Sequence, residues 1–134
     1  MVSLGKLHHI EIYVSDLSQS KVFWQWLLTE KFQYSIFQNW DQGISFKHGQ
    51  TYLVFVQTEK EFKQHEYHRK NIGLNHLAFY ANSSSWMDEL REELIQRGIQ
   101  LLYDERYPNA GGNDTYALYF EDPDRIKVEI VLEK

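Results

Sequence analysis

Residues 7–14 read Leu-His-His-Ile-Glu-Ile-Tyr-Val, and residues 73–80 read Gly-Leu-Asn-His-Leu-Ala-Phe-Tyr. Both stretches alternate apolar and polar side chains with a period of two, which is typical of a β-strand that is covered on one face. A shift of 67 residues (76 minus 9) places His9 on His76 and Tyr13 on Tyr80. The chain therefore reads as two copies of one structural unit.

Each half continues with the same order of elements. Ser15-Asp16 predicts the start of a helix that runs to about Thr29, and Asn82-Ser83-Ser84-Ser85 predicts the start of a helix from about Trp86 to Arg97. Three further strands are expected in each half, first at 32–37, 43–47 and 51–57, then at 99–103, 115–121 and 125–132. The polar, aperiodic residues 58–71 are expected to link the halves.

The strand pattern favours helices on one face of each sheet only. In the opening strand, Ile10, Ile12 and Val14 share the face that a helix would cover. The expected fold is α+β, with two tandem βαβββ modules at residues 5–57 and 72–134. We expect the modules to form a curved, mostly antiparallel sheet cup with the helices on its outer face. A chain of this length is expected to be a single domain, residues 1–134.

Composition excludes several classes of function. The 134 residues carry a formal net charge of −5 and no cysteine, so a metal would need His, Asp or Glu ligands. The acidic balance gives no electrostatic reason to bind nucleic acid or an anionic membrane. No apolar run approaches the roughly 18 residues of a membrane span, and residues 1–9 lack the features of a signal peptide. We expect a cytoplasmic protein whose partner is a small molecule.

Strand register predicts three metal ligands on one face. The apolar residues of strands 7–14, 73–80 and 125–132 take the helix side, which leaves His9, His76 and Glu129 on the concave face. Two imidazoles and a carboxylate are a common ligand set for one divalent ion, and Zn, Fe(II), Mn, Ni and Co all suit it. The alternative is that all three are ordinary half-buried polar residues of strands.

Two charged residues are candidates for roles beside that ion. Glu11 lies two residues beyond His9 on the same face, where it is a general base, an outer partner of the ligand or a surface glutamate. Lys127 shares the face of Glu129, where it pairs with an anionic substrate or lies exposed at the strand rim.

Four uncharged residues are predicted to line the pocket. Tyr13 and Tyr80 occupy equivalent positions in the two halves, although simple packing explains them as well. In residues 53–57, alternation is taken to place Phe55 and Gln57 in the cup.

Four stretches resemble the vicinal oxygen chelate superfamily, which includes glyoxalase I, fosfomycin-resistance thiol transferases, extradiol dioxygenases and bleomycin-resistance proteins. They are residues 7–17, residues 74–79, Gly111-Gly112, and residues 119–124 (Tyr-Phe-Glu-Asp-Pro-Asp) continuing to 127–130. The resemblance implies paired βαβββ modules that close around a metal, with His9, His76 and Glu129 at the ligand positions. It also implies a homodimer.

Two positions depart from the pattern of this superfamily. Glyoxalase I has a further glutamate ligand on the fourth strand of its first module, and Phe55 aligns with it here, so strict glyoxalase I activity is not expected. The turn after Asp124 usually continues with glycine, but this chain has Arg125. Either the arginine adopts a positive φ at a cost of about 1 kcal/mol, or the turn is reshaped.

The resulting hypothesis is a glyoxalase-like, metal-dependent lyase, isomerase or transferase that chelates adjacent oxygens of a small substrate on a divalent ion. The alternative is a metal-free protein of bleomycin-resistance type that sequesters a small molecule in an aromatic groove.

Overall fold

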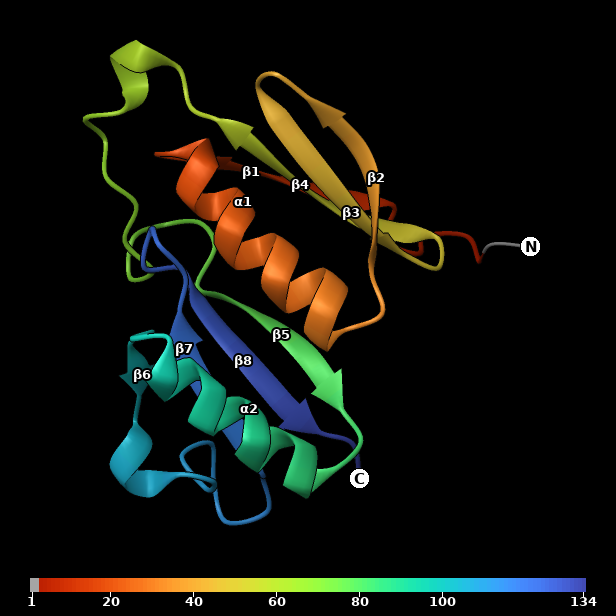
Figure 1. The fold of residues 1–134 in the computed structure, drawn as a ribbon, viewed down its shortest axis with the longest axis vertical. Coiled ribbons are helices and arrows are strands. Elements are labelled where there is room, and N and C mark those ends of the chain that lie inside the picture. The colour runs from red at the N-terminus through yellow and green to blue at the C-terminus, as the bar shows by residue number, and fades with distance from the viewer. Residues whose placement is uncertain (1–2) are drawn as a thin grey trace. The chain divides into compact units, whose positions relative to one another are not determined.

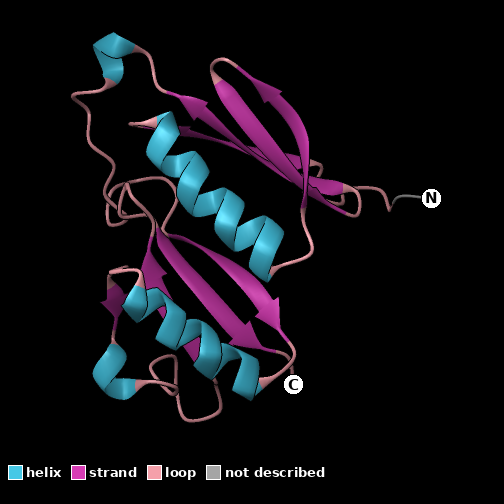
Figure 2. Cartoon of the chain, in the orientation of Figure 1, coloured by secondary structure: helices cyan, strands magenta, loops and turns pink. Residues whose placement is uncertain are grey.

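The computed structural model describes residues 3–134. The chain divides into two compact units between Glu66 and Tyr67. Each unit is built from a strand, a helix and three further strands (Figure 1 and Figure 2). The predicted α+β fold of two βαβββ modules is therefore confirmed.

The elements follow the predicted order. The first unit contains β1 (His9–Val14), α1 (Leu17–Gln25), the π-helical segment η1 (Trp26–Lys31), β2 (Ser35–Trp40), β3 (Gly43–His48), β4 (Thr51–Gln57) and the 3-10 turn η2 (Lys60–Phe62). The second contains β5 (His76–Ala81), α2 (Ser84–Gln96), β6 (Leu101–Leu102), the 3-10 turn η3 (Asp104–Arg106), β7 (Ala117–Glu121) and β8 (Lys127–Leu132).

The first and last strands of each module lie side by side. The strand order is β1-β4-β3-β2 in one sheet and β5-β8-β7-β6 in the other. The pairs β1–β4 and β5–β8 are parallel, and the remaining pairs are antiparallel. This topology brings the start and the end of a module together, although the two segments are far apart in the sequence.

Both helices begin at predicted capping residues. The Asp16 side chain accepts from the backbone N–H of Gln19 at 3.3 Å, and the Ser83 hydroxyl accepts from that of Trp86 at 3.2 Å. Each helix then buries an apolar stripe that faces the sheet of its own unit. No helix within residues 3–134 has both the length and the apolarity needed to cross a bilayer.

β2 begins three residues later than the sequence predicts. The helix continues as η1 to Lys31, and the amides of Phe32 and Tyr34 donate to the carbonyls of Leu27 and Leu28, both at 3.1 Å. These two amides are used at the end of the helix and do not donate to a strand of the sheet, and β2 begins at Ser35.

The turn between β7 and β8 requires a left-handed residue. Arg125 has a φ of 67°, so the first of the two alternatives at this position is the correct one. The Asp122 side chain fixes the turn, because its Oδ1 accepts from the amides of Asp124 at 2.9 Å and Ile126 at 2.8 Å.

Arg125→Gly is expected to raise the free energy of unfolding by about 1 kcal/mol, because glycine adopts a positive φ without a Cβ clash. The substitution loses a contact between Arg125 Nε and Glu121 Oε2 at 3.4 Å, but this contact is exposed on the arginine side and contributes little. Urea denaturation measures the difference. Arg125→Ala is the control, since it loses the same contact and keeps the strain. An alanine variant as stable as the glycine variant would contradict the prediction.

Candidate metal centre

The parallel pair β5–β8 brings two of the predicted ligands together. Register aligns His76 with Lys127 and Ala78 with Glu129, so the side chains of His76 and Glu129 share the polar face of the sheet. His76 Nε2 lies 3.1 Å from Glu129 Oε1, and the two side chains are 34% and 15% exposed. A histidine and a carboxylate separated by 53 residues in the chain are thus in direct contact.

His76 and Glu129 each make a further hydrogen-bond contact, through the side-chain atom that does not face the other residue. His76 Nδ1 lies 2.7 Å from Asn75 Oδ1, within hydrogen-bond distance. The Tyr119 hydroxyl donates to Glu129 Oε2 at 3.1 Å. Burial, and then the Glu129 charge, raise the pKa of Tyr119 to about 12, so this phenol remains a donor at neutral pH.

Tyr119 was not among the site residues predicted from the sequence, although the pattern of β7 indicates which face it takes. Its neighbours Leu118 and Phe120 are apolar and buried on the helix side, so alternation places Tyr119 on the polar face.

The pair of His76 and Glu129 fits a divalent ion. Ligand atoms at about 2.0–2.2 Å from an ion, at neighbouring coordination positions, lie about 3 Å apart, and His76 Nε2 and Glu129 Oε1 are 3.1 Å apart. The same contact is a hydrogen bond when Nε2 carries a proton, and an ion bound between the two atoms would take the place of that proton. Within residues 3–134, however, no three His, Asp or Glu side chains gather as ligands of one ion.

His9, the third predicted ligand, lies in the first unit. It is exposed on β1 and stacks on Tyr52 of β4, with ring centroids 4.7 Å apart and an interplanar angle of 4°. Its Nδ1 lies 2.8 Å from His8 Nδ1. In both modules, therefore, the residue before the histidine contacts Nδ1, and Nε2 is the ring nitrogen left for a metal.

Lys127 lies beside the pair of His76 and Glu129 on the polar face. Its Nζ is 3.5 Å from the Tyr103 hydroxyl and 5.5 Å from the centroid of the Tyr103 ring. The ring of Tyr119 lies 5.9 Å from the same nitrogen. The ammonium group thus sits against two aromatic rings.

The prediction that Phe55 and Gln57 face the polar side of the sheet is wrong. β1 pairs with β4 in parallel and aligns Ile12 with Phe55, so both residues lie on the helix side. Phe55 is fully buried and stacks on Trp24 of α1 at 4.7 Å. Gln57 binds the start of that helix, where its Oε1 accepts from the Leu17 amide at 2.9 Å.

The remaining predicted residues lie exposed on their strands. Glu11 and Tyr13 alternate with the covered residues of β1, and Tyr80 has the equivalent place on β5. They are therefore open to a ligand in their own units.

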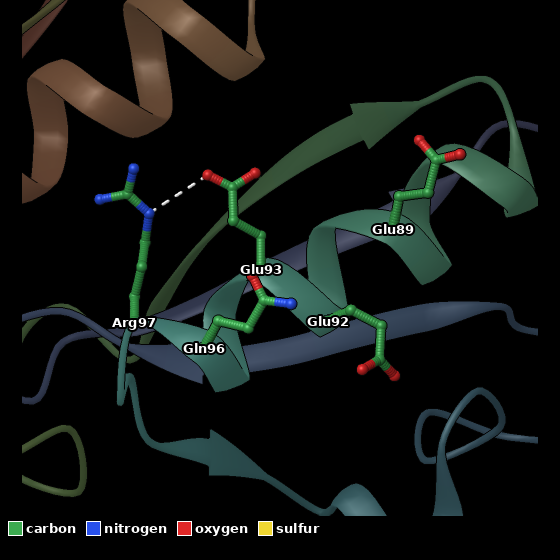
Figure 3. Close-up of a pocket in the computed structure, with 5 residues that line it drawn as sticks. All are labelled: Glu89, Glu92, Glu93, Gln96 and Arg97. Atoms are coloured by element: carbon green, nitrogen blue, oxygen red, sulfur yellow. Dashed lines mark hydrogen bonds and ion pairs between the residues drawn. The ribbon is translucent and has the colours of Figure 1, made fainter.

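A polar depression on α2 is separate from these residues. Its lining is Glu89, Glu92, Glu93, Gln96 and Arg97 (Figure 3). Glu93 pairs with Arg97 at 3.2 Å, and Glu92 points away from this pair. The acidic side chains diverge, which is typical of a solvated helix face.

Comparison with known proteins decides the family. Residues 6–130 match the model of the Glyoxalase/Bleomycin resistance protein/Dioxygenase superfamily. The chain belongs to this superfamily. This confirms the resemblance found in the sequence.

Three proteins illustrate the similarity. The uncharacterized protein YqjT of Bacillus subtilis is 51% identical over 93% of this chain and 97% of its own length. The crystal structure of a glyoxalase-like protein from Bacillus halodurans is 54% identical, covers 97% of each chain and has a TM-score of 0.94. A mutant of the fosfomycin resistance protein FosX from Listeria monocytogenes, complexed with Mn(II) and 1S,2S-dihydroxypropylphosphonic acid, is 18% identical. It covers 96% of this chain and 90% of its own, with a TM-score of 0.68, and shows the fold alone.

Because Phe55 lies on the helix side, the residues of β4 that alternate with it face the polar side of the sheet. They are Tyr52, Val54 and Val56, since these alternate with the covered residues. None of the three carries a carboxylate or an imidazole. The sequence predicted from Phe55 that this strand lacks the glutamate ligand of glyoxalase I. That conclusion is unchanged, because the residues that do face the polar side also lack a carboxylate.

Proposed function

We propose that the chain is a metal-dependent enzyme in which His9, His76 and Glu129 bind one divalent ion. The observation that carries the proposal is the contact of 3.1 Å between His76 Nε2 and Glu129 Oε1. Asn75 contacts the other ring nitrogen of the histidine, and Tyr119 contacts the other oxygen of the carboxylate. The proposed substrate is a small molecule with two adjacent oxygens, and the reaction is that of a lyase, isomerase or transferase. We also propose that the protein acts as a homodimer.

The residues of the chain have distinct roles in this proposal. The ion, when bound, would supply Lewis-acid stabilisation of negative charge on a chelated oxygen. Glu11 is exposed on β1 two residues from His9, and its carboxylate accepts a proton from the substrate. Lys127 lies beside Glu129 and contacts an anionic part of the substrate. The β4 side chains Tyr52, Val54 and Val56 supply no fourth ligand, so the proposal excludes strict glyoxalase I activity.

The FosX complex supports this chemistry at the level of the fold. That protein holds Mn(II) together with a small diol phosphonate. Imidazole and carboxylate ligands also suit Mn, Zn, Fe(II), Ni and Co, so the donor set alone does not select one metal.

Sequestration of a ligand without metal is the second candidate function. The observation in its favour is an aromatic row on the polar face of the first unit, where Tyr52 lies 4.7 Å from the ring of His9 and 5.1 Å from that of Phe37. Such a row suits a flat, apolar ligand.

Metal titration separates the two functions. Chelator-treated protein is titrated calorimetrically with Mn(II) and Zn(II), and one ion per chain is expected. The loaded protein is then assayed with dicarbonyl, catechol and phosphonate substrates. Turnover that is lost on chelation supports the enzyme. A protein that binds no metal at millimolar concentration, yet binds flat apolar ligands, would establish sequestration instead.

A further inference from the structure

The Tyr119 hydroxyl lies in a space that Gly111 keeps open. A Cβ atom at position 111 would lie 2.9 Å from the Tyr119 hydroxyl oxygen and 3.3 Å from Thr115 Cγ2. The next residue, Gly112, has a φ of +127°, whereas Gly111 does not have a positive φ. Glycine is therefore needed at position 111 for space, and at position 112 for its backbone conformation.

The loop that contains Gly111 and the ring of Tyr119 are both held in place by further contacts. Within the loop, the Gly112 amide donates to Asn109 O and the Thr115 amide to Gly112 O, both at 3.0 Å. The Asn109 side chain also donates to Thr115 O at 2.9 Å. On the other side, the Tyr119 ring packs edge-on against Tyr103 at 5.3 Å. A methyl group at position 111 would thus displace the Tyr119 hydroxyl.

The Tyr119 hydroxyl lies next to the loop at Gly111 and contacts Glu129, the proposed metal ligand. Tyr119 and Glu129 are register partners on β7 and β8, and the hydroxyl donates to Glu129 Oε2 at 3.1 Å. This bond leaves Oε1 directed at His76 Nε2. Without it, the carboxylate keeps only its contact with His76, and the proposed ligand geometry is less constrained.

We propose that Gly111 and Tyr119 are positioning residues for Glu129: Gly111 gives the Tyr119 hydroxyl its room, and the hydroxyl orients the carboxylate toward His76 and a divalent ion. The inference rests on the proposed metal site. It gives Gly111 a role in ligand geometry that a residue of a flexible turn would not have.

A double-mutant cycle tests the link between the two residues. Tyr119→Phe and Gly111→Ala are each expected to weaken Mn(II) binding by about 10- to 100-fold, the usual loss when an outer partner of a ligand is removed. Because phenylalanine has no hydroxyl to collide with, adding Gly111→Ala to Tyr119→Phe should cause little further loss. Gly112→Ala is the matched control. It strains the same loop but meets only Thr115 Oγ1, at 3.9 Å, so binding should change by less than about threefold.

A metal-free measurement separates this inference from the proposed function. In crystals of metal-free Gly111→Ala, the Tyr119 hydroxyl should lie beyond hydrogen-bond distance from Glu129 Oε2. If the wild-type chain binds no metal, the metal site is wrong, whatever that distance shows. If the wild type binds metal, additive losses in the cycle, or unchanged affinity in Gly111→Ala, would overturn the inference. So would a loss in Gly112→Ala as large as that in Gly111→Ala.

Discussion

Replacing Phe55 with alanine is expected to lower the free energy of unfolding by about 3–5 kcal/mol. The side chain is 0% exposed, stacks on Trp24 at 4.7 Å and meets Phe46 at 6.1 Å. Truncation removes this apolar contact and leaves a cavity between α1 and the sheet. Equilibrium urea denaturation measures the loss. Metal binding by Phe55→Leu, which keeps an apolar core residue, should be unchanged.

Tyr52→Ala is the control on the opposite face of the same strand. Tyr52 is half-buried and stacks on His9, so its loss should cost clearly less than truncation at Phe55. A Phe55→Ala variant of near wild-type stability, with altered ligand binding, would contradict the structure. It would restore the assignment of Phe55 to the pocket.

The error at Phe55 has a physical cause. Residues 53–56 read Leu-Val-Phe-Val, a continuous apolar run in which no alternation distinguishes one face from the other. The face of such a strand is set by its neighbour. Only the parallel alignment of Ile12 with Phe55 shows that this side chain lies beneath the helix.

Strands with clear alternation were predicted correctly. β1, β5 and β8 each carry apolar residues at every second position, and the structure places His9, His76 and Glu129 on the uncovered faces of their sheets. The same rule applied to β7 would have found Tyr119. The sequence thus determines which face a residue takes wherever a strand is half polar.

Other features of the site depend on tertiary structure. The space above the Tyr119 hydroxyl depends on how residues 107–116 fold back over β7, and no local pattern encodes this distance. Likewise, the contact between His76 and Glu129 requires the parallel pairing of β5 with β8. The ligand role of His9 is still a prediction, because it concerns residues of both units.

Glu129→Gln is expected to weaken divalent-metal binding by at least about 100-fold, the upper end of the loss caused by removing an outer partner of a ligand. Glutamine has nearly the same shape, and its amide oxygen can still accept from Tyr119, as Glu129 Oε2 does at 3.1 Å. The variant therefore removes the ligand charge while keeping the packing of β8. Calorimetric titration with Mn(II) gives the affinity, and thermal unfolding of the metal-free protein should show little change.

Glu92→Gln makes the same change in net charge at a place remote from the site. Glu92 is exposed on α2, in the polar depression of Figure 3. An attraction that depended only on the overall negative charge would weaken equally in both variants, whereas coordination by Glu129 predicts loss in one alone. If Glu129→Gln bound metal as tightly as the wild type, the carboxylate would be only a hydrogen-bond partner of His76. The enzyme proposal would then lose the observation that carries it.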